Sequence, residues 1–365
     1  MHSLLLIPDI SGFTRFVNEI EIEHGRHIVS ELLEVIIDSD DLGLTVAEIE
    51  GDAILFYLKD DVPPVPRIAA LAERMFIGFH TQLKLYESRR ICHCGACSSA
   101  QSLSLKIVAH AGPLEFIHVK NFLKPYGRDT ILVHRLLKNS IPMNEYLLVT
   151  KHLAEKDSTN AESVLPSWVA FQEGLDSYDE IGEVRYRFAA MGELREMVPI
   201  PDQISDFERM PNPIAAEVFV NRPVSESYEL ISNLDVRQDW TKGLDELKFD
   251  PDRVNRVGMQ HQCVVRGDLL DFETISTDYG PNKLVYGERL VNPPFVKDLA
   301  LFTLLEAEGT GTRIRREFHY RRKPFPASLL TPIFRIMAKR QISSTLNNFR
   351  EYVDRISLST NNDVG

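Results

Sequence analysis

The sequence lacks an excess of basic residues and any long apolar run. Its 365 residues carry a formal net charge of −12, which argues against a general nucleic-acid binder, because a phosphate backbone requires clustered lysine and arginine. No apolar run reaches the length of about 18 residues that a membrane-spanning helix needs. No basic-then-apolar leader precedes the first strand-like segment. We therefore expect a cytoplasmic protein with no integral membrane segment and no nucleic-acid partner.

Cysteine is also scarce, and its distribution is uneven. Three of the four cysteines, Cys92, Cys94 and Cys97, fall within six residues, and Cys263 stands alone. In a cytoplasmic chain this clustering favours metal or redox chemistry over structural disulfides. Zinc takes four ligands, so His93, Cys263 or a second subunit would have to complete a zinc site. The alternative is that the three cysteines are free thiols on a hairpin or loop.

The length of the chain and its hydrophobic content of 44% suit two globular domains. Residues 198–213 are rich in proline and polar residues. They separate two regions that differ in their pattern of strand-like and helix-like segments, and we interpret them as a linker. The predicted organisation is a first domain over 1–197, a second over 214–357 and a disordered tail over 358–365.

The first region alternates strand-like and helix-like segments. Strands are expected at 4–8, 44–50, 53–58, 103–111 and 186–191, and helices at 15–39 and 68–86. The apolar positions of the second helix keep helical spacing and are assigned to the core. This pattern predicts an α+β domain with one mixed or antiparallel sheet and helices on a face.

The second region predicts a strand at 216–220, a helix at 225–232, several further strands and a long final helix. Turn signals stand at 280–282, 292–294 and 309–311. The apolar residues of the final helix step by three and four and form one stripe, which we expect to lie on the concave face of the sheet. These residues are Ile342, Leu346, Phe349, Val353 and Ile356.

Two carboxylates stand at strand ends in the first region. Asp9 ends the first strand, three residues before Gly12, and Asp52 follows Gly51 in a predicted hairpin turn. Taken alone, Asp9 or Ser11 would simply cap the following helix. If the hairpin pairs with the first strand, Asp9 and Asp52 converge. Two such carboxylates repel one another, and a pair of magnesium ions about 3.5 to 4 Å apart would balance them.

Four motifs in this order make most of residues 1–192 resemble the class III nucleotidyl cyclase catalytic domain. They begin at Asp9, Gly51, His110 and Tyr126, and read DISGFT, GDA, HAGP and YGRDTILVHRL. More narrowly, the chain resembles a bacterial family of cyclase-like proteins of uncharacterised function. The fold implied is a ferredoxin-like, nucleotidyl-cyclase-like α/β sandwich.

The resemblance implies a nucleoside triphosphate site. Asp9 and Asp52 would bind two magnesium or manganese ions. The backbone of Ile10, Ser11, Gly12 and Phe13 would hold the β- and γ-phosphates. Arg135, eight residues after Gly127, would stabilise charge on the triphosphate from across a homodimer interface.

The chain also departs from the cyclase pattern. Cyclases place a ribose-orienting asparagine four residues after Gly127, where this chain has Ile131. The two positions that select the purine hold Glu48 and Lys124, the reverse of the charges in an adenylyl cyclase. Either this pair recognises guanine, or it forms an ordinary ion pair that closes the purine site.

The second region resembles the START-like superfamily, which includes polyketide cyclases and lipid-transfer domains. The resemblance covers about residues 213–357 and starts with VFVNRPVSESYELISN at Val218. It implies a helix-grip domain whose curved sheet and long helix enclose an apolar cavity for a hydrophobic small molecule or lipid. Pocket candidates are Trp240, Phe272, Phe295, Phe302 and Met337, and the alternative is that these side chains are plain core. The basic run 313–323 is interpreted as a solvated strand face, and contact with an anionic ligand is the alternative.

Together these observations favour a cytoplasmic sensor or regulator. A divergent cyclase-like domain would bind metal and nucleotide, and a START-like domain would bind an apolar ligand. An active cyclase that makes cyclic nucleotide and pyrophosphate is the main alternative, and Ile131 opposes it. A non-catalytic ligand carrier, with the first domain as a dimerisation scaffold, is the third hypothesis.

Overall fold

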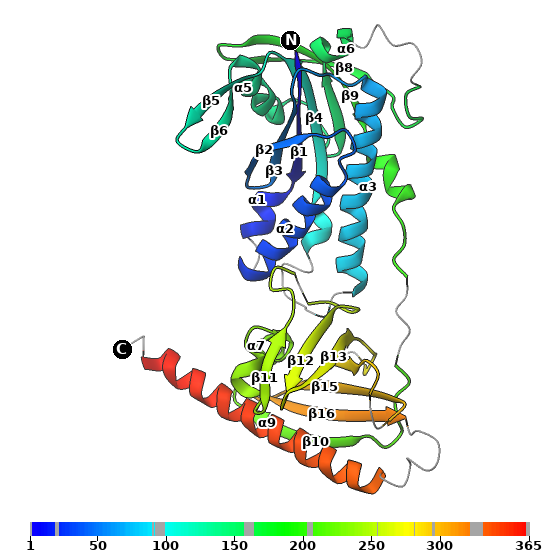
Figure 1. Cartoon of the computed structure of the whole chain (residues 1–365), viewed down its shortest axis with the longest axis vertical. Coiled ribbons are helices and arrows are strands. Elements are labelled where there is room, and N and C mark those ends of the chain that lie inside the picture. Colours follow the sequence, from blue (N-terminus) through cyan, green and yellow to red (C-terminus); the bar gives the residue numbers. More distant parts are fainter. Residues whose placement is uncertain are drawn as a thin grey trace. The chain divides into compact units, whose positions relative to one another are not determined.

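The structure is a computed structural model of the chain. It describes residues 2–18, 22–89, 91, 99–156, 164–202, 207–253, 255–280, 282–293, 296–321 and 331–362. The chain divides into two compact units (Figure 1). Unit 1 comprises Met1–Ser88 and Cys94–Pro201, and unit 2 comprises Arg89–His93 and Asp202–Gly365.

Unit 1 is built on a seven-stranded sheet with the order β2-β3-β1-β4-β7-β9-β8. All its neighbouring strands run antiparallel except β4 and β7, which are parallel. The strands are β1 Ser3–Ser11, β2 Thr45–Glu50, β3 Ala53–Leu58, β4 Ser104–Gly112, β7 Tyr146–Thr150, β8 Gln172–Tyr178 and β9 Gly182–Ala190. A separate two-stranded ribbon consists of β5 Glu115–Val119 and β6 Phe122–Tyr126.

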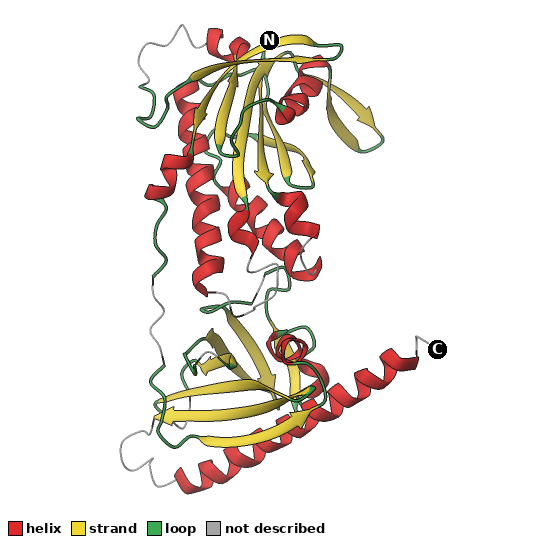
Figure 2. Ribbon diagram, turned by 180° about the vertical axis from the view of Figure 1, so that it is seen from behind, coloured by secondary structure: helices red, strands yellow, loops and turns green. Residues whose placement is uncertain are grey.

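Helices cover both faces of this sheet. Leu132, Val133 and Leu136 from α5 and the turn after it pack against Leu5 and Ile7 of β1. Because successive strand side chains point to opposite faces, the buried Leu4 and Leu6 face the other side, where α1, α2 and α3 lie (Figures 1 and 2). The helices are α1 Phe13–Asn18, α2 Ile22–Asp38, α3 Val65–Arg89, α5 Arg128–Arg135, α6 Lys151–Lys156 and the 3-10 helices η1 Ala100–Ser102, η2 Leu136–Lys138 and η4 Gly192–Met197.

Strand β1 is central because its sequence is apolar on both faces. From Ser3 to Ile10 every residue is buried. This burial is typical of an inner strand covered on both sides. Pro8 lacks an N–H donor, and the pairing of β1 with β3 skips Ile7 and Pro8 between Leu6 and Asp9.

The predicted α+β class of the first region is confirmed, and its hairpin and long second helix lie where the pattern places them. The helix expected at 15–39 corresponds to helical structure in the described residues of this stretch. Two helices, α1 and α2, occupy this stretch, and residues 19–21 between them lie outside the described part.

Unit 2 contains a second seven-stranded sheet, in the order β10-β16-β15-β14-β13-β12-β11, and all its pairs are antiparallel. Chain-adjacent strands pair from β11 to β16, and β10 adds at the β16 edge. The strands are β10 Ile214–Val220, β11 Leu244–Lys248, β12 Gln260–Val265, β13 Asp268–Ile275, β14 Leu284–Leu290, β15 Asp298–Glu308 and β16 Gly311–Arg321.

A long helix packs on this sheet. Helices α7 Val224–Ser232 and α8 Arg237–Trp240 follow β10, and α9 Thr331–Asn362 ends the chain (Figure 2). The predicted stripe of α9 is confirmed, since Ile342, Leu346, Phe349 and Val353 are buried in one cluster with the sheet. Helix α9 extends to Asn362, and the predicted disordered tail over 358–365 stays a prediction. Among the helices in the described ranges, none combines the length and apolarity that crossing a membrane requires.

Candidate functional site

Asp9 and Asp52 converge at one end of the unit 1 sheet. Asp9 lies opposite Ala53 in the β1–β3 register, so the hairpin turn falls beside it. The Ile10 N–H donates to the Asp52 backbone carbonyl at 3.0 Å. Gly51 adopts a φ of +63°, which the tight turn between β2 and β3 requires. The local turn chemistry therefore places the second carboxylate against the first.

The negative charges of the Asp9 and Asp52 carboxylates repel one another. Burial, followed by the negative charge of Asp9, raises the pKa of Asp52 to about 6. A hydrogen bond within the Asp52 residue and the positive charge of Lys106 act in the opposite direction. A cation placed between the carboxylates would offset this repulsion.

Lys106 is a site residue that the sequence analysis missed. It lies opposite Asp9 in the β1–β4 register, and its Nζ is 2.9 Å from Asp9 Oδ2. The same Nζ donates to the Leu137 carbonyl at 3.2 Å. Lysine is rarely buried without a partner, so its presence in an otherwise apolar strand is the signal that could have identified it.

The segment from Ile10 to Phe13 turns sharply beside this pair. Gly12 has a φ of +89°, and a Cβ there would lie 3.2 Å from the Ser102 carbonyl oxygen. Gly51 lies within van der Waals reach of the Phe13 ring, since a Cβ built on Gly51 would be 3.8 Å from it. Ser11 and Gly12 therefore expose backbone next to the carboxylates, at the place predicted for phosphates.

Glu48 and Lys124 form an ion pair, with Lys124 Nζ 2.8 Å from Glu48 Oε2. The two side chains are thus paired, while closure of the purine site and guanine selection both stay predictions. His134 lies 3.6 Å from Glu48 and 3.8 Å from Glu50. The ligand atoms of Glu48, Glu50 and His134 are close enough together to share one cation.

Arg135 lies at the exposed end of α5. The helix is fixed to β4 by His110, whose Nε2 is 2.8 Å from Asp129 Oδ1 and whose Nδ1 is 2.8 Å from Thr150 Oγ1. The hydrogen bond from His110 lowers the pKa of Asp129. Gly112 is required beside this pair, because a Cβ there would overlap the Asp129 carboxyl group.

Apolar side chains are exposed along the β5–β6 ribbon and on α5. Ile131, at the ribose position of the resemblance, is also 55% exposed, and no described contact explains an apolar residue there. Exposed apolar groups of this kind are typical of interaction surfaces. The exposed members are Ile117, Val119, Phe122, Leu123, Tyr126 and Ile131.

The predicted zinc ligands Cys92, Cys94 and Cys97 lie outside the described residues. Cys263 is a buried free cysteine of β12. Burial, followed by the negative charge of Glu288, raises the pKa of its thiol to about 12, so the thiol is protonated at neutral pH.

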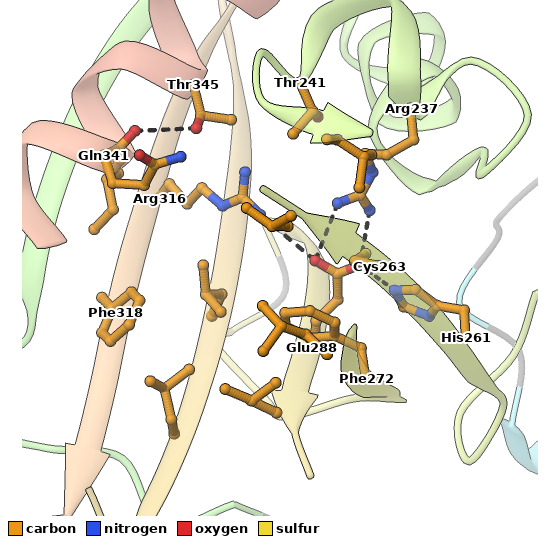
Figure 3. A pocket seen from close by; sticks show the side chains of 17 residues that line it. Arg237, Thr241, His261, Cys263, Phe272, Glu288, Arg316, Phe318, Gln341 and Thr345 are labelled. Atoms are coloured by element: carbon orange, nitrogen blue, oxygen red, sulfur yellow. Dashed lines mark hydrogen bonds and ion pairs between the residues drawn. The ribbon is translucent and has the colours of Figure 1, made fainter. Parts of the chain in front are cut away.

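Unit 2 encloses a cavity of about 300 Å³ between the sheet, α8 and α9 (Figure 3). A buried ionic cluster forms one part of its wall. Arg237 Nη2 and Nη1 donate to the two oxygens of Glu288 at 2.8 and 3.1 Å. His261 Nε2 lies 3.3 Å from Glu288 Oε1, and Arg316 Nη2 lies 3.5 Å from Oε2. The positive charge of Arg237 holds the pKa of Glu288 well below its usual range, although burial opposes this effect.

The structure corrects the predicted pocket lining. Phe272 lines the cavity, and Trp240, Phe302 and Met337 do not. Trp240 packs edge-on against Phe349, Phe302 belongs to a separate cluster with Phe207, and Met337 is 65% exposed on α9. Phe295 lies outside the described residues. Phe272 and Phe302 lie on strands and face opposite sides of the sheet, whereas Trp240 and Met337 lie on α8 and α9.

A family model described as "Protein of unknown function (DUF2652)" matches residues 29–146. An uncharacterized protein of Mycobacterium tuberculosis is 35% identical over 127 residues, which are 35% of this chain. The chain spans 59% of the length of that relative.

Solved structures similar to the chain include class III cyclase domains. The guanylyl cyclase Cya2 shares 15% identity, covers 52% of this chain and 91% of its own, and has a TM-score of 0.39. The guanylate cyclase domain of RhGC from Catenaria anguillulae, in complex with GTP, shares 14% identity, covers 52% of this chain and 96% of its own, and has a TM-score of 0.37. An adenylyl cyclase, CyaB from P. aeruginosa, is also similar over 52% of this chain. Adenylyl and guanylyl cyclase domains are thus structural neighbours of about half of the chain.

Proposed function

We propose that this protein is a nucleotide-binding regulator whose second unit binds an apolar small molecule. In this proposal, unit 1 holds a divalent cation and a nucleoside triphosphate at Asp9 and Asp52. Unit 2 provides a START-like binding cavity. The observation that carries the proposal is the convergence of the two carboxylates, which leaves Asp52 with a pKa of about 6.

Magnesium or manganese fits this donor set. Carboxylate oxygens are the ligands that such hard cations prefer, and a cation would remove the repulsion between Asp9 and Asp52. When bound, it would also neutralise charge on the phosphates of a nucleotide. Lys106 already supplies one positive charge at Asp9, so this site needs less added charge than two bare carboxylates would.

The paired Glu48 and Lys124 support a regulator more than an enzyme. Lys124 is already paired with Glu48, since its Nζ lies 2.8 Å from Glu48 Oε2. The side chain of Ile131 cannot form a hydrogen bond to a ribose. An active nucleotidyl cyclase remains the second candidate, because Arg135 is exposed at the helix end where the resemblance places the charge-stabilising arginine. In both cases we propose that Arg135 acts across a homodimer.

The first experiment is binding of ATP and GTP to the full chain with magnesium or manganese, with cyclic nucleotide and pyrophosphate measured in the same samples. We expect binding that requires the divalent ion and is lost in Asp52→Ala. The matched control is Asp235→Ala, an aspartate of unit 2 remote in sequence from these motifs. Cyclic product that disappears in Arg135→Ala would favour the active cyclase, and absence of nucleotide binding would overturn the proposal for unit 1.

A further inference from the structure

Four side chains surround the carboxylate of Glu288 in unit 2, and they share its two oxygens unequally. Arg237 occupies both oxygens, and the Tyr286 hydroxyl donates to Oε1 at 3.0 Å. His261 also approaches Oε1. Arg316 is left with Oε2 at 3.5 Å, the weakest of these contacts. Figure 3 shows Arg316 reaching from its strand toward the same carboxylate that Arg237 already holds.

The charges of the cavity wall do not balance. Among the residues that line it, Arg237 and Arg316 carry positive charge and Glu288 alone carries negative charge. Arg316 is 8% exposed, and burial lowers its pKa; the negative charge of Glu288 opposes this effect, and the positive charge of Arg237 adds to it. A buried charge without a matching partner is costly. The wall therefore has one positive charge in excess.

Polar atoms of this cluster also lack hydrogen-bond partners. Arg316 Nε, Arg237 Nε, His261 Nδ1 and Thr241 Oγ1 are buried and have no partner within the described structure. Buried donors in native proteins are nearly always satisfied, so each exception needs an explanation. A ligand with an acceptor group in the cavity would supply one.

The rest of the wall is apolar. It includes Leu270, Phe272, Leu290, Leu299, Leu301 and Phe318. A second hollow of about 400 Å³ shares Leu270, Leu290 and Leu299 with the first, and exposed Lys242 and Arg266 line it. The two hollows therefore adjoin along shared apolar residues, and the ionic cluster lines only the first.

We propose that this cavity binds a monocarboxylate with an apolar body, the carboxylate on Arg316 and the body among the leucine and phenylalanine side chains. The inference rests on the proposed ligand-binding function of unit 2 and names its ligand class. A guanidinium presents parallel donors that match a carboxylate in a bidentate geometry. One excess positive charge matches a single negative charge, whereas it would leave one charge of a phosphate dianion unmatched.

The test uses decanoate, decan-1-ol, decylamine and decyl phosphate as probes in isothermal titration calorimetry with the full chain at pH 7.5. We expect decanoate to bind about tenfold or more tightly than decan-1-ol, because a charge-assisted hydrogen bond replaces a neutral one. Arg316→Gln should remove that advantage and leave the affinity for decan-1-ol unchanged. Arg313→Gln is the matched control, since Arg313 is an exposed arginine of the same strand paired with Glu308.

Each outcome is decisive. Equal binding of decanoate and decan-1-ol overturns the carboxylate assignment and leaves apolar-ligand binding intact. Tighter binding of decyl phosphate or decylamine overturns the charge argument. No binding of any probe overturns the ligand-binding function itself. The comparison of probes on the unaltered chain decides the question even if Arg316→Gln does not fold, and a Leu301→Trp variant that fills the cavity should abolish binding of decanoate.

Discussion

Lys106 and Asp9 face each other across β1 and β4 and form an ion pair of 2.9 Å. Both side chains are largely buried, so water screens this pair less than a surface pair. The lysine therefore occupies one flank of the carboxylate pair that we propose as a cation site. Any divalent ion that binds Asp9 must compete with this ammonium group or share the carboxylate with it.

Replacing Lys106 should separate metal binding from nucleotide binding. We expect Lys106→Gln to bind manganese alone about three- to tenfold more tightly, because the competing charge is gone. The same variant should bind nucleoside triphosphate more weakly, since the lysine no longer contributes positive charge near the phosphates. Titration calorimetry with manganese, and then with nucleotide, measures both effects. Lys151→Gln on the exposed surface is the control, and an unchanged manganese affinity in Lys106→Gln would contradict the competition.

The raised pKa of Asp52 predicts a pH-dependent effect on stability. Its folded pKa of about 6 lies above the ordinary value of 3.8, so the charged form destabilises the fold once the pH exceeds both values. After a discount for partial exposure, Asp52→Asn should raise the free energy of unfolding by about 1 kcal/mol at pH 7.5 without divalent ions. The gain should shrink as the pH falls through 6 toward 4. Urea unfolding at pH 7.5 and 4.5 measures it, with Glu115→Gln as control, and a gain that persists at pH 4.5 would be the contrary result.

Arg135 provides a test of assembly. Because its side chain is exposed, Arg135→Ala should change the free energy of unfolding by less than about 0.5 kcal/mol. If Arg135 serves the site of a second subunit, Asp52→Ala and Arg135→Ala chains purified together as a tagged heterodimer should keep one intact site per dimer. Nucleotide titration should then show half the sites at the original affinity. Weak binding in the heterodimer, equal to that of each variant alone, would exclude a shared site.

Gly112 should tolerate no side chain. A methyl group there would overlap the Asp129 carboxyl and break its hydrogen bond to His110. We expect Gly112→Ala to lower the free energy of unfolding by about 2 to 3 kcal/mol. Gly192→Ala is a matched control, because its added Cβ would make only an ordinary contact of 3.7 Å with Glu145. Equal stability of the two variants in urea unfolding would contradict the packing argument.

The features that the sequence predicted well are local. The β2–β3 hairpin depends on Gly51 at its turn and on apolar residues on either side, and both can be identified within a dozen residues. The apolar stripe of α9 is likewise a matter of spacing along one helix.

The residues that the sequence analysis missed depend on partners distant in the chain. Arg316 was included in a basic run assigned to solvent, and that assignment suits Arg313, which is exposed. Arg316, however, lies on the same face of β16 as the inward-facing Ile314 and Phe318. This spacing of two residues was the available signal. Its carboxylate partner, Glu288, lies on β14, and no local pattern connects the two strands.

The excess positive charge in the unit 2 cavity predicts that replacing the carboxylate and replacing Arg316 will affect the free energy of unfolding differently. Glu288→Gln leaves two buried guanidinium groups without a carboxylate and should lower the free energy of unfolding by about 3 to 5 kcal/mol. Arg316→Gln removes the excess cation while Arg237 and Glu288 keep their bidentate contact, so stability should stay within about 1 kcal/mol of the original or rise. Urea unfolding of both variants in ligand-free protein at pH 7.5 gives the comparison. A loss in Arg316→Gln as large as that in Glu288→Gln would mean that the arginine is a structural partner of the carboxylate, and the excess charge would then have no need of a ligand.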